Sequence, residues 1–258
     1  MKLQPLIIIL FVLIIRPIAS LANSAEGYYD LYYFNNQSTK IAPEALNDQT
    51  LEQIEDPFQP VNQIIFGINY TLDLIVIEPA AYIYQNITPQ VGQDRVNNLF
   101  ENLSSPITFF NQILQGKFVE ASDTLGCFIT NTTLGFGGLV NVAEEFGVQK
   151  DHTDFGMTLA HYGFHGGPYV VLPIIGPTSF RDMLGKGVDF FSDPISRNMK
   201  NQDNVYLGIG KLVYVRSDNY ELINNIKYNS LDPYTFMKTV YYQNRIVRSD
   251  EAAEVEHE

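Results

Sequence analysis

The segment from residue 154 to residue 182 places the strongest constraint on how this chain can fold. It contains five glycines and three prolines, yet only three charged residues. Glycine and proline at this density repeatedly interrupt regular secondary structure. An irregular segment in a soluble protein is normally polar, because its backbone meets water. This segment is apolar, so we expect its backbone to lie against protein or lipid rather than bulk water.

The charge of the chain narrows the partners that it can have. Its 258 residues carry a formal net charge of −13, with 17% charged and 45% hydrophobic residues. So acidic a chain is poorly suited to displacing counterions from nucleic acid, and we expect no nucleic-acid partner. It also lacks the basic segments that dock on anionic lipid. Any contact with a membrane must therefore be apolar and made through amphipathic surfaces.

The N-terminus is typical of an exported protein. A positive start at Met1-Lys2 precedes an unbroken apolar run over residues 6–15, about half the length that a membrane span needs. Ser20-Leu21-Ala22 then offers small residues to a signal peptidase, so residues 1–22 are predicted to be a cleavable signal peptide. Residues 23–50 are predicted to form an irregular N-terminal arm. No later apolar run reaches roughly 18 residues, so we expect no spanning segment in the mature chain.

Proline and its preceding residues predict a helical domain over residues 51–249. Proline is favoured at the first position of a helix, and Asp or Ser just before it caps the free N–H groups. This arrangement occurs at Asp56-Pro57, Ser105-Pro106, Asp193-Pro194 and Asp232-Pro233. Gln59 lies in capping-box spacing to Asp56. The apolar residues that follow step by three and four, which predicts a helix that stops before Pro79.

The same reasoning places the other helices and sets the fold class. Thr178 or Ser179 is expected to cap one of them. No alternating run bounded by hairpin turns competes, so the predicted fold class is all-α. An acidic, disordered tail is expected at 250–258. The further helices are predicted at about 94–103, 106–114, 118–135, 140–146, 155–161, 179–191, 205–226 and 233–247.

Patterns typical of catalysis or metal binding are weak. His161 and His165 have the spacing of a metal-binding pair on a helix, but Gly163 lies between them and no further ligand completes the set. No G-x-S-x-G elbow supports a serine lipase. We therefore expect no catalytic residue, no metal and no cofactor. Four carboxylates close in sequence are interpreted as solvating a short helix and loop rather than as a glycosidase pair: Glu144, Glu145, Asp151 and Asp154.

Three glycines follow the helix predicted to end near residue 135. Gly135, Gly137 and Gly138 lack the Lys and Ser/Thr of a phosphate-binding loop, and no predicted strand precedes them. They can act as a hinge, because closely spaced glycines absorb changes in backbone angle. They can equally be simple helix terminators. The sequence leaves both interpretations open.

Several motifs together resemble the MlaA family, also called VacJ. They are Asp56-Pro57 followed by Asn62, the run NTTLGFGGL at 131–139, the segment 154–182, and Asp232-Pro233-Tyr234 followed by Tyr241 and Gln243. They occur in the family's order and cover roughly residues 50–248. The resemblance implies a ring of amphipathic helices lying in the membrane plane around a central amphipathic channel. It implies that mislocalised phospholipid is removed from the outer leaflet of the outer membrane, on whose periplasmic side the protein lies. Porin trimers and a soluble periplasmic lipid carrier are the implied partners.

The resemblance also implies where the working parts of the molecule lie. A mobile hairpin would cover residues 139–155, and its hinge and gate residues would be Gly135, Gly137, Gly138, Leu139, Val142 and Phe146. The apolar segment supplies the residues expected to face the channel or the membrane: Phe164, Tyr169, Val171, Leu172, Ile174 and Ile175.

The chain departs from the family pattern at two places. Family members commonly carry a lipid on a Cys at the signal cleavage site, whereas the single cysteine here is Cys127, expected to be a small buried residue on a helix. Val61 and Gln63 stand where the family has Phe and Arg. Two other functions remain as alternatives: a membrane-associated phospholipase, and a structural protein that binds a porin without transporting lipid.

Overall fold

The computed structural model describes residues 56–148 and 151–254. The predicted signal peptide at 1–22, the arm at 23–50 and the last residues of the tail lie outside the described residues. The regular elements of the described part are all helices except for one short hairpin, which confirms the all-α fold class. The helices are α4 (Gln59–Leu72), the π-helix η3 (Asp73–Ile77), α5 (Glu78–Ile87), α6 (Gln90–Leu114), α7 (Phe118–Thr133), α8 (Val142–Glu145), α9 (Phe155–His161), α10 (Phe180–Ser192), α11 (Pro194–Asn198), α12 (Asn201–Asp218), α13 (Tyr220–Asn229) and α14 (Pro233–Glu254).

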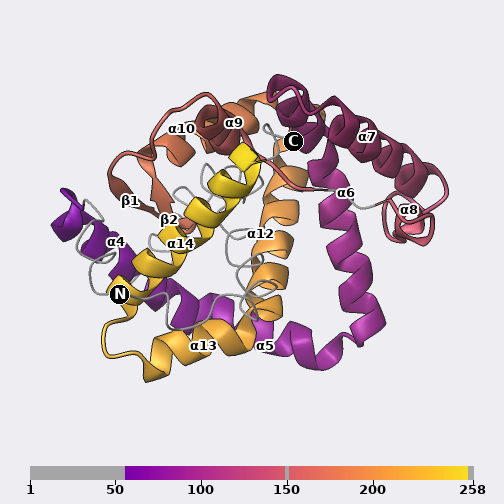
Figure 1. The fold of residues 1–258 in the computed structure, drawn as a ribbon. Helices are drawn as coiled ribbons and strands as arrows, with labels where there is room; N and C mark the ends of the chain where they lie inside the picture. Colours follow the sequence, from indigo (N-terminus) through magenta and orange to yellow (C-terminus); the bar gives the residue numbers. More distant parts are fainter. Residues whose placement is uncertain (1–55, 149–150, 255–258) are drawn as a thin grey trace.

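The helices are arranged as a ring rather than in layers (Figure 1). α4 and α5 run along one edge, α6 along the next, and α9 with α10 along the edge opposite α5. α14 and the hairpin complete the ring, while α12 crosses it and packs against α5 and α6. α7 packs along α6, and α8 lies at the end of α7. The ring-like arrangement of helices is therefore confirmed.

α6 is a single helix, so the prediction of two helices separated at Pro106 is wrong. Pro106 lies inside α6, where it removes one backbone hydrogen bond and costs about 3 kcal/mol or more. Ser104 and Ser105 just before it donate their hydroxyls to the carbonyl of Glu101, and α6 packs against α7 along its length. Tertiary packing outweighs the local preference of proline to end a helix.

The first described helix also continues where proline was expected to stop it. α4, η3 and α5 follow each other without a break, and Pro79 lies at the second position of α5. The π turn shifts the bonding so that Glu78 donates to the carbonyl of Asp73, and Pro79 then stands where a helix tolerates a missing N–H. The continuous helix Gln59–Ile87 has 29 residues, and its most apolar 18-residue window has a mean hydropathy of 1.5 and is 11% buried. By length and composition it could span a membrane, which corrects the expectation that no such segment exists.

Some of the predicted helix caps form and others do not. Ser179 accepts from the backbone of Asp182, Asp193 caps α11, and Asp232 accepts from Thr235, all as expected. The capping box at Asp56 does not form, because α4 begins at Gln59 with no side-chain cap. The helix expected at 205–226 is divided between α12 and α13 at Asn219. α14 continues to Glu254, so the predicted disordered tail is helical over its first residues.

A short antiparallel hairpin was not predicted. β1 (Tyr169–Leu172) pairs with β2 (Gly176–Ser179), with Tyr169 opposite Ser179. Its turn places Ile174 at φ +67° and Gly176 at φ +90°, the left-handed region that favours glycine. Four-residue strands with a proline in one of them carry too little alternation to be recognised from sequence.

Two apolar clusters pack inside the ring. One joins the hairpin to α4 and α14 through Tyr169, Val171, Tyr234 and Tyr241. The other joins α6 to α12 through Phe100, Tyr214 and Val215. Both are small for a chain of this size, so polar contacts carry much of the remaining interior.

Candidate functional site

The helices bury their polar sides and expose their apolar ones. α7 buries Thr124 and Asn131 while it exposes Phe118, Val119 and Ile129. Among the described residues, buried polar and charged side chains outnumber buried hydrophobic ones. A protein surrounded by water places these groups the other way round. α6 shows the pattern most strongly, because its buried residues besides Phe100 are Asn102, Ser105, Thr108, Asn111 and Gln112.

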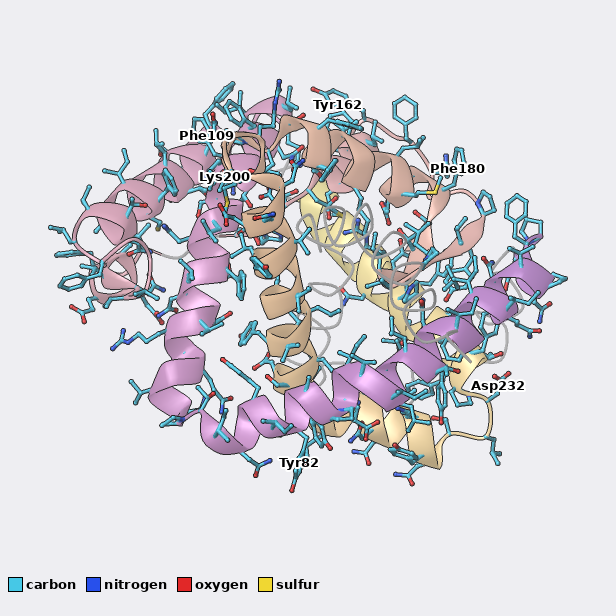
Figure 2. The ribbon with its side chains drawn as sticks, turned by 180° about the vertical axis from the view of Figure 1, so that it is seen from behind. Tyr82, Phe109, Tyr162, Phe180, Lys200 and Asp232 are labelled. Carbon is cyan, nitrogen blue, oxygen red and sulfur yellow. The ribbon has the colours of Figure 1, made fainter. Side chains whose placement is uncertain are left out.

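The exposed apolar side chains lie on several sides of the ring. Figure 2 shows Tyr82 on α5, Phe180 on α10 and Tyr162 after α9 pointing away from the molecule. Monomeric soluble proteins rarely expose apolar residues so extensively, and such patches mark contact with a membrane or with another protein. The most exposed positions on the α4–α5 edge are Val61, Ile64, Ile68, Ile75, Tyr82, Ile83 and Ile87.

Two asparagines on the inner side of α4 hold the hairpin. Asn62 donates its amide to the carbonyl of Tyr169 at 3.0 Å and accepts from the backbone N of Val171 at 2.9 Å. Asn69 repeats the pattern with Leu172 at 2.9 Å and Ile174 at 2.8 Å. Each side chain thus pairs with the hairpin backbone as another strand would, and so satisfies a strand edge that would otherwise be buried without partners.

The hairpin covers one side of an apolar pocket. Val171, Ile174 and Ile175 form one wall, and Phe66 of α4 and Ile226 of α13 lie among the residues of the others. The pocket has a volume of about 120 Å³. A cavity of roughly 150 Å³ lined by aliphatic side chains takes up benzene. This pocket can therefore hold a short length of hydrocarbon chain, but not an entire phospholipid.

One end of this hairpin pocket is charged. Arg216 of α12 pairs with Asp73 at 2.8 Å, and Lys227 of α13 pairs with Asp73 at 2.9 Å and with Glu78 at 2.6 Å. Arg216 is 2% exposed, and its Nη1 atom has no hydrogen-bond partner. Burial alone would lower the pKa of Lys227, but the hydrogen bonds and charges of the two carboxylates outweigh it and raise that pKa. Arg216, Lys227 and Asp73 thus place two positive charges and one negative charge beside an apolar space.

The predicted channel or membrane residues divide into four groups. Val171, Ile174 and Ile175 line the hairpin pocket. Phe164 is 60% exposed on the surface and does not belong to it. Tyr169 is 0% exposed, in the core beneath the hairpin, which corrects its assignment as a lipid-facing residue. Leu172 is half-buried and bonds to Asn69 through its carbonyl.

The three glycines of the proposed hinge form a tight turn after α7. Gly137 and Gly138 have φ values of +76° and +97°. A Cβ on Gly135 would come within 2.2 Å of the carbonyl oxygen of Val140, and one on Gly138 within 2.6 Å of Asn102. A Cβ on Gly137 would meet nothing. Within the predicted gate, Leu139 and Phe146 are exposed and Val142 is half-buried.

The residues weighed for metal binding or catalysis are placed apart or used structurally. Among the residues that the structure describes, no three His, Cys, Asp or Glu side chains converge on a possible metal site. Asp154 caps α9 and pairs with Arg245 at 2.8 Å. Glu144 accepts from Asn141. Cys127 is buried in α7, as predicted.

Sequence reasoning missed the residues that build the hairpin pocket. Asn62 was noted only as part of a motif, and Asn69, Arg216 and Lys227 were not singled out. One signal was available: Asn62 and Asn69 are two helical turns apart, and most residues between them are apolar. Polar residues on one stripe of such a helix indicate that this stripe faces protein.

A ring of helices that exposes apolar side chains and encloses polar ones defines the class of helical proteins that work in contact with lipid. The model of the MlaA lipoprotein family matches residues 54–248. This chain belongs to that family.

Relatives and a solved structure agree with this assignment. An uncharacterized protein of Rickettsia bellii is 35% identical over 244 residues, which cover 88% of both chains. The intermembrane phospholipid transport system lipoprotein MlaA of Haemophilus influenzae is 29% identical over 209 residues, covering 78% of this chain and 82% of that one. A solved structure described as the structural basis for maintenance of bacterial outer membrane lipid asymmetry has a TM-score of 0.62 and 29% identity. It matches 77% of this chain and 99% of its own.

Proposed function

We propose that this protein is the outer-membrane component of an intermembrane phospholipid transport system. In this role it removes mislocalised phospholipid from the outer leaflet, passes it to a soluble periplasmic carrier and so maintains the asymmetry of the membrane. Relatives that carry the name of such a system support the proposal. The observation that carries it is the reversed distribution of polar and apolar side chains over α4 to α7.

The physical chemistry of a phospholipid explains why this distribution suits transport. At about 0.8 kcal/mol for each buried CH₂ group, the exposure of two acyl chains to water costs more than roughly 20 kcal/mol. A ring embedded by its apolar outer side keeps the tails in lipid. Its polar inner side offers hydrogen bonds to the head group, which pure hydrocarbon cannot supply. The hairpin pocket adds a place for part of one chain.

The partners belong to the proposal as well. A porin trimer would bury part of the exposed apolar surface, and the periplasmic carrier would accept the lipid. We propose that the protein is not an enzyme, which agrees with the transport role of its family.

Incubation of the purified protein with labelled phospholipid tests the function. Extraction and mass spectrometry should recover bound, intact lipid. Hydrolysed lipid would support the phospholipase alternative instead. A protein that retains no lipid, yet still binds a porin, would be the structural alternative.

The glycine turn gives a test of gating. Gly137→Ala adds a Cβ that meets no neighbour but disfavours the left-handed backbone by about 1 kcal/mol. We expect more phospholipid in the outer leaflet and greater detergent sensitivity, with unchanged expression and helicity. Gly138→Ala is a poorer test, because its Cβ would collide with Asn102. Normal lipid distribution in the Gly137 variant would mean that the glycines only end α7.

A further inference from the structure

A second cavity lies between α6, α7 and α8, next to the glycine turn. Its volume of about 410 Å³ falls within the roughly 300–1,000 Å³ of known ligand pockets. Five asparagines and two glutamates make up most of its wall, and the described residues of this wall include no basic and no aromatic side chain. This polar cavity is therefore acidic, whereas the hairpin pocket is apolar and has Asp73, Arg216 and Lys227 at its charged end.

Several hydrogen-bond donors in the wall are engaged by other groups of the protein. Asn131 donates to Asn141, and Asn141 donates in turn to the carboxylate of Glu144, both at 2.9 Å. Ser105 donates its hydroxyl to the backbone carbonyl of Glu101 at 3.1 Å. Each of these three groups therefore donates to another protein atom.

Asn102 supplies the most informative of these acceptors. Its side chain is 4% exposed, and its amide N donates to Thr132 at 2.9 Å. Its Oδ1 atom has no hydrogen-bond partner. A buried carbonyl oxygen without a donor costs free energy, and such an atom in a native protein calls for a ligand or water that supplies the missing hydrogen. The backbone of Gly138 packs directly against this side chain.

We propose that the polar cavity binds the primary ammonium group of an aminated phospholipid head group, an inference that rests on the proposed function. A primary ammonium carries one positive charge and three N–H donors and accepts no hydrogen bond. It therefore complements the carboxylate of Glu144 and the oxygen of Asn102 that has no hydrogen-bond partner.

The same wall disfavours the other head groups. A trimethylated ammonium has no N–H to give to Asn102 and is usually held by aromatic faces, and no aromatic side chain is among the described residues of this wall. A glycerol head group leaves the lipid with a net negative charge, which the two carboxylates repel. The polar cavity thus favours the aminated head group among phospholipids with identical acyl chains.

Competition binding on the full-length protein in detergent tests the inference. The probes are phosphatidylethanolamine, phosphatidylcholine and phosphatidylglycerol with the same acyl chains. We expect the ethanolamine lipid to bind about tenfold more tightly than the other two. Glu144→Gln keeps an acceptor for Asn141 but removes a charge, and should abolish most of this preference.

Glu145→Gln is the matched control. Glu145 is the next residue of α8, is exposed and lies outside the wall of the cavity, so its variant should keep the preference. Equal binding of all three lipids by the unmodified protein would overturn the inference but leave the transport function intact. Failure to bind any intact phospholipid would instead count against the proposed function.

Free ethanolamine separates the lipid from a soluble amine. It presents the same ammonium group without acyl chains, so we expect it to displace the lipid only at concentrations far above those of the lipid itself. Equal affinity for ethanolamine and for its phospholipid would show a site for a small amine and would contradict a lipid head-group site.

Discussion

Two clusters of buried charges, at opposite edges of the ring, use the same chemistry for different ends. In the first, Arg245 of α14 pairs with Asp154 and with Asp182, each at 2.8 Å. Arg181 and Tyr241 also bond to Asp182. We call this set the Arg245 cluster; it ties α14 to α9 and α10, and neither of the two cavities reaches it.

The second cluster, named here the Arg216 cluster, consists of Asp73, Glu78, Arg216 and Lys227. It differs in that one side borders the hairpin pocket and Nη1 of Arg216 has no partner. The comparison teaches that the same kind of buried ion pair can serve in packing helices together, as around Arg245, or in lining a cavity, as around Arg216.

The largest expected effect is the loss of Arg245. Arg245→Met leaves Asp154 and Asp182 buried without their main partner, which costs about 3–5 kcal/mol. The free energy of unfolding in detergent measures it, with the exposed Arg197→Met as a control. If the free energy of unfolding fell by less than about 1 kcal/mol, the Arg245 cluster would contribute no more than a surface ion pair. It would then not differ in strength from the Arg216 cluster.

Close backbone packing around the Arg245 cluster gives the next largest effect. A Cβ on Gly185 would lie 2.4 Å from the backbone N of Gly156, whereas one on Gly187 would meet nothing. Gly185→Ala should therefore cost about 1–3 kcal/mol through overpacking. Gly187→Ala in the same helix should be neutral or stabilise by up to about 1 kcal/mol. Similar melting temperatures for the two variants would mean that α9 and α10 can move apart freely.

Removal of Arg216 should cost less. Arg216→Met leaves Asp73 its bond to Lys227 and fills part of the pocket end with an apolar side chain. We expect a loss of about 1–2 kcal/mol, clearly below that of Arg245→Met. Chemical denaturation of both variants under identical conditions makes the comparison. An equal or larger loss of unfolding free energy for Arg216→Met would show that the Arg216 cluster stabilises the fold at least as much as the Arg245 cluster.

The smallest effect is a difference in pH dependence. Burial alone would raise the pKa of Asp182, but the charge and hydrogen bond of Arg245 hold it well below its usual range. That contribution is complete above about pH 4 and disappears as the pH falls through the folded pKa. The raised pKa of Lys227 affects stability at high pH instead. Its contribution is complete below about pH 10 and disappears as the pH rises through the folded pKa.

Melting curves across pH can check this difference. The gap between the wild type and Asp182→Asn should narrow only in strong acid, and the gap to Lys227→Met only in strong alkali. If the melting temperatures of wild type and both variants changed in parallel over the whole pH range, the pKa values of Asp182 and Lys227 would be the same in the folded and unfolded protein.

Sequence reasoning succeeded where structure is determined locally. Ser179, Asp193 and Asp232 cap helices through bonds that span two or three residues, so residue type and spacing are enough. The rule that proline ends a helix failed at Pro79 and Pro106. There a π turn or packing against another helix compensates, and neither is visible in a short window.

Less of the candidate site than of the fold could be predicted from the sequence. Asp73 and Arg216 are 143 residues apart, and nothing near either of them indicates its partner. The motif around Asn62 and the apolar segment with Val171 pointed to the right elements. They did not indicate that an amide would replace a neighbouring strand. Whether the glycine turn is a hinge stays a prediction.

The reversed burial pattern has a consequence for how this chain reaches its folded state. Hydrophobic collapse in water would draw Ile64, Ile87 and Phe118 inward and expose the asparagines of α6 and α7, the opposite of the native arrangement. The native ring is therefore favoured only when an amphiphile covers its outer side. Its thermal stability should rise with detergent or lipid concentration, as it does for any protein whose ligand binds the folded state alone. Lipid is then a folding partner of this protein as well as its proposed cargo.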